Sequence, residues 1–276
     1  MRLGEIQTLR IVRFKDFGAY LGEDGSDETV LLPKKEIPET AGVNDVLPVF
    51  LYKDSEDRLI ATTREPRLTV GKMAPLTVRQ VSKIGAFLDW GLEKDLLLPF
   101  REMEGKVEEG DEILVRLYID KTGRLAASMK GLYHLLSKQS PYQKGDQVNG
   151  RIYEFGHDFG TFVAVDDKYS AMIPKYEKTS QFRIGDILEL HVTGVKEDGK
   201  LDVSLRKAAV EEIPEDAQKL LDLLDSYAGV LPFTEKAKPE VIFRETGLSK
   251  NAFKRAVGHL YKERKISLEG GKIRRI

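Results

Sequence analysis

Flat aromatic rings recur beside a glycine in three short segments of the chain. The segments are KDFGAYL at 15–21, KIGAFLDW at 83–90 and HDFGTFVAV at 157–165. Rings that are exposed on a strand can stack on nucleobases, and each stacked base contributes about 1–3 kcal/mol with little preference for sequence. The same rings could instead fill the interior of a small β domain, and the sequence leaves both interpretations open.

These segments open three repeats whose landmarks keep a constant spacing. The intervals from the glycine to the proline of LLPKKE, LLPFRE or MIPKYE are 15, 14 and 14 residues. An Asp stands twelve residues after each proline, and a turn followed by a short apolar segment then ends each repeat. Because four landmarks recur in one register, the chain is predicted to contain three copies of one small domain.

Each repeat contains about five short segments of alternating polarity, separated by Gly, Asp, Asn and Pro. Five short strands in so small a domain must close to hide their edges, and the five-stranded OB barrel is a common solution. We therefore expect a mainly β chain with three tandem OB barrels at 1–66, 67–138 and 144–208. A glycine between two rings also permits a β-bulge that turns one ring toward the outer face.

The C-terminal residues 213–276 have a different pattern. Apolar residues in 215–228 lie on one helical face, Pro239 and Gly247 are placed to begin and end a second helix, and Ser249 is placed to cap a third. Gly270 and Gly271 then fit a tight hairpin turn. Three helices and a hairpin predict a C-terminal α+β domain, the winged helix-turn-helix.

Charge is distributed unevenly along the chain. The net charge is −1 for 276 residues, yet residues 250–276 contain nine Lys and Arg against two Asp and Glu, whereas residues 1–66 contain nine against thirteen. Candidate contacts for nucleic acid on the predicted third helix and wing are Lys250, Asn251, Lys254, Arg255, Lys272, Arg274 and Arg275. A solvated basic helix face is the alternative interpretation.

Segments of the form DFGAY, LLP and DRLIATTR resemble the S1-like RNA-binding barrel. Three such repeats followed by a winged helix, with the LLPxxE variant, resemble the conserved virulence factor B (CvfB) family of bacterial RNA-binding regulators. The resemblance covers nearly the whole chain. It implies an RNA-binding face made of Phe17, Tyr20 and Arg58 beside Asp54 in the first barrel, Phe87 and Arg124 beside Asp120 in the second, and Phe159, Phe162 and Lys200 in the third.

Several positions depart from the S1-like pattern. Proline occupies the place of its histidine in all three repeats, Ile84 replaces the first aromatic of the second repeat, and Lys196 replaces an Asp in the third. The third repeat keeps its aromatic pair, so we expect it to be the best RNA-binding barrel. His157 is a further candidate to stack on a base, with an ordinary polar loop residue as the alternative.

No catalytic constellation is found in the sequence. Cysteine is absent, only four histidines occur, and there is no HExxH, GxxxxGK or GxSxG motif. No apolar run approaches the roughly 20 residues that a membrane span needs. We therefore expect a cytoplasmic protein that is not an enzyme and needs no metal or cofactor.

The expected function is binding of single-stranded RNA through the third barrel and the winged helix, with post-transcriptional regulation of gene expression and of virulence implied by the family resemblance. One alternative is a transcription regulator whose winged helix binds DNA. Another is an accessory subunit that docks on a ribonuclease or ribosome, with the first two barrels contacting a protein partner.

Overall fold

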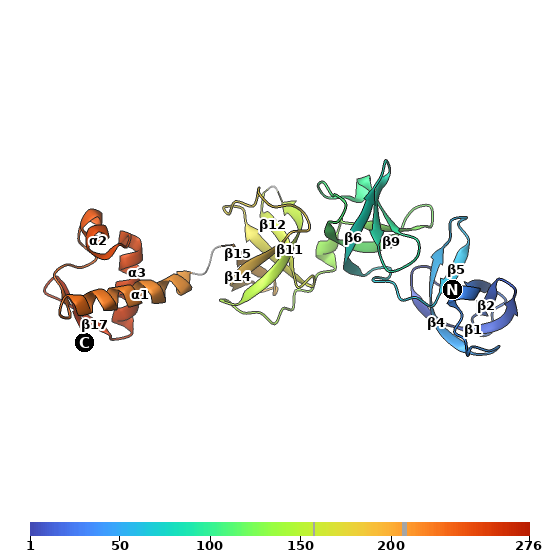
Figure 1. Cartoon of the computed structure of the whole chain (residues 1–276), viewed down its shortest axis with the longest axis horizontal. Helices are drawn as coiled ribbons and strands as arrows, with labels where there is room; N and C mark the ends of the chain where they lie inside the picture. Colours follow the sequence, from blue (N-terminus) through green and yellow to red (C-terminus); the bar gives the residue numbers. More distant parts are fainter. Residues whose placement is uncertain (157, 206–208) are drawn as a thin grey trace. The chain divides into compact units, whose positions relative to one another are not determined.

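The computed structural model describes residues 1–156, 158–205 and 209–276, with the backbone alone described in 209–214. The chain divides into two compact units, Met1–Leu205 and Arg206–Ile276. Figure 1 shows strands throughout the first unit and mostly helices in the second, coloured by position along the chain. The predicted mainly β fold with a C-terminal α+β domain is confirmed.

The first barrel consists of β1 (Ile6–Lys15), β2 (Gly18–Gly22), β3 (Thr29–Pro33), β4 (Val46–Lys53) and β5 (Leu59–Thr62). The strands close in the order β1-β2-β3-β5-β4. The β3–β5 pairing is parallel and runs through the single pair Leu31 and Ile60. Alternate residues such as Leu9, Ile11 and Leu21 point inward and are fully buried, as a closed barrel of pleated strands requires.

The second barrel consists of β6 (Met73–Val81), β7 (Gly85–Asp89), β8 (Leu96–Pro99), β9 (Glu112–Ile119) and β10 (Leu125–Ser128). Its sheet has the order β10-β9-β6-β7-β8, so β8 and β10 are its edge strands. The equivalent strands of the first barrel, β3 and β5, pair with each other and close that barrel. This barrel is therefore nearly closed, whereas the sequence predicted a fully closed barrel. Strand β8 has four residues where the equivalent β3 of the first barrel has five.

The third barrel consists of β11 (Gln147–Gly156), β12 (Gly160–Val165), β13 (Tyr169–Pro174), β14 (Ile187–Val195) and β15 (Leu201–Ser204). It closes in the same order as the first barrel. Short 3-10 turns, Lys34–Glu36 (η1) and Phe100–Glu102 (η2), follow the third strand of the first two barrels. A third turn, Leu132–His134 (η3), lies in the linker between the second and third barrels.

Adjacent barrels within the first unit share apolar and polar contacts. Phe50 of the first barrel meets Trp90 of the second in an edge-to-face contact with ring centroids 5.6 Å apart. Arg151 of the third barrel is 5% exposed, and its Nη2 donates to Oε2 of Glu112 in the second barrel at 2.7 Å. Its Nε donates to Asp167 Oδ1, also at 2.7 Å. Because the guanidinium is buried, losing either carboxylate would leave a poorly compensated charge at the joint.

The C-terminal unit contains α1 (Ala209–Ser226), β16 (Val230–Leu231), α2 (Pro239–Thr246), α3 (Lys250–Lys262), β17 (Ile266–Glu269) and β18 (Lys272–Arg275). The strands form a small sheet in the order β16-β18-β17. Ser249 caps α3 by accepting a hydrogen bond from the Ala252 N–H at 3.2 Å. Gly270 and Gly271 have φ of +56° and +72°, which suits the predicted hairpin turn.

The motif glycine of each repeat begins the second strand of its barrel, at Gly18, Gly85 and Gly160. A Cβ at any of them would lie 2.1–2.2 Å from a carbonyl oxygen of the third strand, which for Gly160 is the oxygen of Ile173. The predicted bulge at the glycine is wrong. The register shift lies in the preceding strand, between Ile152 and Glu154 in the third barrel. The glycine thus permits close strand approach, and the bulge is a separate feature.

Substituting Gly160 by alanine should destabilise the third barrel. The added Cβ would collide with the Ile173 carbonyl, and φ of +140° is strained for any residue with a side chain. We expect Gly160→Ala to lower the free energy of unfolding by about 2 kcal/mol or more, measured by urea denaturation followed by circular dichroism. Gly194→Ala is the matched control, because a Cβ at that position would meet no atom within 4 Å. Equal stability of the two variants would contradict this expectation, because it would show that β13 shifts far enough to accommodate the added methyl group.

Candidate nucleic-acid interface

The third barrel exposes its two motif rings on the outer face. Phe159, in the turn between β11 and β12, is 70% exposed. Phe162 lies on β12 between the buried Thr161 and Val163, so strand alternation points its half-buried ring outward. Its ring stacks on Tyr153 of β11 with centroids 6.3 Å apart and planes inclined by 30°. One ring is therefore fixed against the barrel and the other is free to meet a ligand.

A groove of about 530 Å³ runs along these rings. Strands β11, β12 and β13, the turn before β15, and the linker that precedes the third barrel all contribute to it. The lining residues are Gly131, Tyr133, His134, Tyr153, Glu154, Phe159, Phe162, Ser170, Ala171, Met172, Lys196, Lys200 and Leu201. Its volume lies within the range of about 300–1,000 Å³ typical of small-ligand sites.

Two lysines stand at the groove, each paired with a neighbouring carboxylate. Lys200 Nζ lies 2.5 Å from Asp198 Oδ2, and Lys196 Nζ lies 3.1 Å from Asp202 Oδ1. Hydrogen bonds to Asp198 and then to Tyr133 raise the pKa of Lys200. Because both carboxylates are partly exposed, these pairs are weak enough for a phosphate to compete with them.

Sequence reasoning missed three aromatic residues of this groove. Tyr133 and His134 come from the linker between the second and third barrels, outside the repeated motifs. Tyr153 is the bulged residue of β11; it is 1% exposed, and its hydroxyl has no hydrogen-bond partner among the described residues. No periodic signal identifies a bulged position, so these contributions could not be read from strand patterns.

A second exposed aromatic patch lies beyond the β11–β12 turn. Phe155 is 38% exposed and lines a shallow groove of about 320 Å³ together with Lys175 and Lys178. Tyr176, next to Lys175, is 74% exposed. The predicted contact His157 lies outside the described residues. Sequence signals for this patch existed in EFG and PKYE, but the motif alignment gave them no role.

The first barrel presents a similar pair of rings in a different electrostatic setting. Phe17 is 58% exposed and meets Tyr20 edge to face with centroids 6.2 Å apart. The Arg13 guanidinium lies 4.4 Å from the Tyr20 ring centroid. Arg58, a predicted RNA contact, pairs with Asp54 through its Nε at 2.9 Å and also with Glu56. Its charge is thus directed into its own turn.

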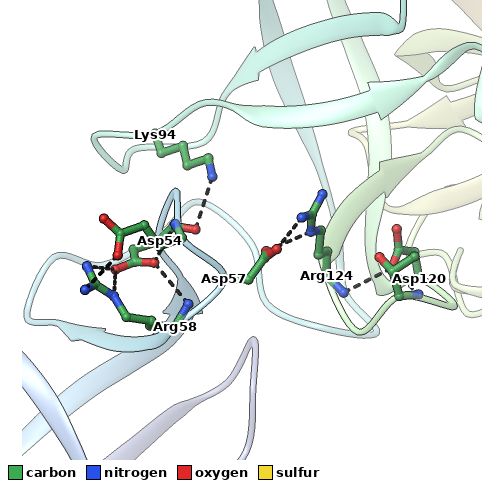
Figure 2. A network of polar contacts seen from close by, with 8 residues as sticks. Asp54, Asp57, Arg58, Lys94, Asp120 and Arg124 are labelled. Carbon is green, nitrogen blue, oxygen red and sulfur yellow. Dashed lines mark hydrogen bonds and ion pairs between the residues drawn. The ribbon is translucent and has the colours of Figure 1, made fainter.

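The equivalent face of the second barrel is partly covered by the first. Arg124 Nε donates to Asp57 Oδ1 at 2.7 Å, and Arg124 Nη2 contacts the other oxygen of the same carboxylate. Figure 2 shows Asp57 pointing at Arg124, and it shows Lys94 of the second barrel near Asp54, which lies in the same turn as Asp57. Phe87 is half-buried and lines the hollow of about 340 Å³ between these groups. Two predicted contacts, Phe87 and Arg124, therefore belong to the joint between barrels.

The winged helix exposes most of its predicted contacts. On α3, Asn251, Lys254 and Arg255 are exposed, whereas Lys250 is half-buried and its Nζ donates to the Ala237 carbonyl at 3.0 Å. Lys250 is therefore less exposed than the other predicted contacts on α3, because its ammonium ties α3 to the preceding loop.

The wing, β17 and β18, carries the other predicted cations. Lys272 and Arg274 are exposed on β18. Arg275 forms an ion pair with Asp225 at the end of α1. The wing thus offers two cations to a ligand, and the third is engaged within the domain.

Metal-binding clusters and membrane-spanning helices are two further kinds of feature that could reveal a function. Across residues 1–156, 158–205 and 215–276, whose side chains the structure describes, no group of three His, Cys, Asp or Glu side chains could hold a metal ion. Among the helices that the structure describes, none is long and apolar enough to cross a membrane.

Family models match most of the chain. A model described as "S1 domain" matches residues 3–64 and 70–130. A model described as "Virulence regulatory factor CvfB, second domain" matches residues 133–207, and one described as "CvfB-like winged helix domain" matches residues 218–274. The domain types follow one another in the predicted order.

Relatives are similar over nearly their whole length. Conserved virulence factor B of Staphylococcus epidermidis is 30% identical over 284 residues, which cover 98% of this chain and 94% of the relative. The uncharacterized protein YitL of Bacillus subtilis is 31% identical over 281 residues, covering 98% and 93%. A crystal structure described as a multidomain protein with nucleic acid binding domains from Streptococcus pneumoniae aligns with a TM-score of 0.57 at 27% identity, covering 99% and 98%.

The pair formed by Asp57 and Arg124 should make the joint between the first two barrels sensitive to pH. The hydrogen bond from Arg124 lowers the pKa of Asp57 below its ordinary value of 3.8. The pair therefore stabilises the fold above that value, and the contribution is lost as pH falls through the lower folded-state pKa. Asp57→Asn should lower the thermal midpoint slightly at pH 7 and leave no difference from wild type in strong acid.

The matched control is Asp27→Asn, an exposed carboxylate of the same barrel. Thermal unfolding of both variants from pH 7 down to the acid limit of folding measures the effect. Because the pair is exposed, about 0.5 M salt should reduce it. An Asp57→Asn difference that grows as pH falls would contradict this account.

Proposed function

Because this chain belongs to the conserved virulence factor B family, we propose that it binds single-stranded RNA through its third barrel and its winged helix. The observation that carries the proposal is the 70% exposed ring of Phe159 beside Phe162, in a groove that also contains two lysines. Unpaired bases present flat faces to such rings, whereas bases inside a duplex are already stacked. The proposal assigns no catalytic step to the chain.

The third barrel is the better binding surface because its face is open. In the second barrel Arg124 is held by Asp57, and the first barrel directs Arg58 into its own acidic turn. A ligand phosphate would have to compete with those carboxylates, as it would with Asp198 and Asp202 beside the lysines of the third barrel. At the third barrel the groove contains the lysines and both rings together, so stacking and charge neutralisation act on the same strand of RNA.

The winged helix adds affinity through charge. Lys254 and Arg255 on α3 and Lys272 on the wing are exposed cations that can neutralise phosphates without reading bases. A helix of this kind can also enter the major groove of duplex DNA. The cations of α3 and the wing need only phosphates, which unpaired RNA also supplies. We therefore propose that RNA is the ligand of the winged helix as well.

Regulation of gene expression after transcription follows as the proposed cellular role. One family model that matches the chain is described as the second domain of a virulence regulatory factor, and the relative from Staphylococcus epidermidis is described as a virulence factor. A protein that holds unpaired RNA without processing it can change the lifetime or translation of a transcript. The role rests on RNA binding and would fall with it.

Removing both rings of the third barrel should weaken RNA binding. Phe159→Ala with Phe162→Ala deletes two stacking surfaces, each worth about 1–3 kcal/mol, so a loss of at least about tenfold in affinity is expected. Fluorescence anisotropy with a labelled RNA of about 12 nucleotides measures it, and thermal unfolding checks the fold. The matched control is Phe17→Ala with Tyr20→Ala in the first barrel, expected to change affinity less than about threefold. Equal losses in both variants would contradict the preference for the third barrel.

Removing cations from the winged helix should change the dependence of binding on salt. Lys254→Ala with Lys272→Ala is expected to reduce the slope of log affinity against log salt by about 1.4, since each of the two phosphate contacts to a single strand contributes about 0.7. Titrations of single-stranded RNA and of duplex DNA between about 50 and 300 mM salt measure it. An unchanged slope for RNA, or duplex DNA bound more than about tenfold tighter than RNA, would overturn the assignment.

A further inference from the structure

The linker between the second and third barrels forms one wall of the RNA groove. Tyr133 and His134 of η3 line the groove together with Phe159 and Phe162 of the third barrel. The linker is held in place by apolar packing, because Leu132 and Leu136 are only 1% and 4% exposed and belong to one apolar cluster. That cluster also contains Leu114 of β9 and Tyr153 of β11. The wall is therefore a packed part of the joint.

Neighbouring side chains fix the position of the Tyr133 ring within this wall. Its ring meets His134 edge to face with centroids 5.4 Å apart. The ammonium of Lys200 lies 5.1 Å from the ring centroid and that of Lys138 lies 6.0 Å from it. Two cations beside one half-buried ring are positioned to neutralise a phosphate while the ring itself contacts a base.

We infer that Tyr133 is a further RNA-binding residue, which provides a second stacking surface for a nucleobase that enters the groove beside Phe162. The inference rests on the proposed function and extends its site beyond the third barrel. The ligand is an unpaired base of RNA. Aromatic side chains in the groove suit a stacked nucleobase, and the lysines in the groove suit the phosphate that is linked to it. The RNA site is thus incomplete without residues 131–138.

The hydroxyl of Tyr133 has a separable role. It accepts a hydrogen bond from the ammonium of Lys200, which also pairs with Asp198. Removing the hydroxyl leaves the π face in place, whereas removing the ring deletes the stacking surface. Phenylalanine, leucine and alanine at position 133 therefore separate stacking from hydrogen bonding and from apolar bulk.

The test measures affinity of the intact chain for a labelled oligouridylate of about 12 nucleotides by fluorescence anisotropy. Tyr133→Ala is expected to bind about tenfold more weakly, and Tyr133→Phe within about twofold of wild type. Tyr133→Leu keeps apolar bulk without a π face and is expected to lose affinity like the alanine variant. This variant keeps the test valid if alanine disturbs the linker.

Leu135→Ala is the matched control, since Leu135 belongs to the same linker, is 37% exposed and does not line the groove. It should bind as wild type. If Tyr133→Ala and Tyr133→Leu also bind as wild type while the Phe159 and Phe162 double variant is weak, the inference is wrong and the proposed function stands. If the double variant binds as wild type too, the proposed function itself is wrong.

Discussion

The close approach of the third strand to the motif glycine is the constraint on which the proposed binding face depends. In each barrel a carbonyl oxygen of the third strand lies 2.1–2.2 Å from the position that a Cβ on the glycine would take. No side chain fits there, and the second and third strands pack closely against each other. The residue before the glycine then lies in the turn outside the sheet, and the residue two positions after it points outward. This geometry exposes Phe17 and Phe159 and turns Tyr20 and Phe162 toward solvent.

Three copies of one face are used in different ways. In the first barrel the Tyr20 ring is covered by Arg13 beside an acidic turn, and in the second barrel Arg124 is engaged by Asp57. The third barrel keeps an open groove, and the linker enlarges it with Tyr133. The cost of burying Arg151 at the joint is offset by two carboxylates. The linker packs into an apolar cluster that contains residues of both the second and the third barrel. Repetition thus supplies the scaffold, and the joints between barrels decide which copy stays available.

Much of the architecture could be predicted because its signals are local or repeated. Period-two segments predicted the strands, and Ser249, Gly247 and the two glycines of the wing predicted where the elements of the winged helix begin and end. Contacts between barrels could not be predicted, because the partner of Arg124 lies 67 residues away at a joint with no repeat. Tyr153 and Tyr133 were missed for a related reason, since a bulge and a packed linker have no sequence period.

Cross-linking of RNA carrying 4-thiouridine to the intact chain, with the attached peptides identified by mass spectrometry, tests most directly whether unpaired RNA lies on the third barrel. The account predicts cross-links at peptides that contain Phe159, Phe162 and Tyr133, together with peptides of α3 in the winged helix. Cross-links confined to the first two barrels, or spread evenly over all three, would contradict it.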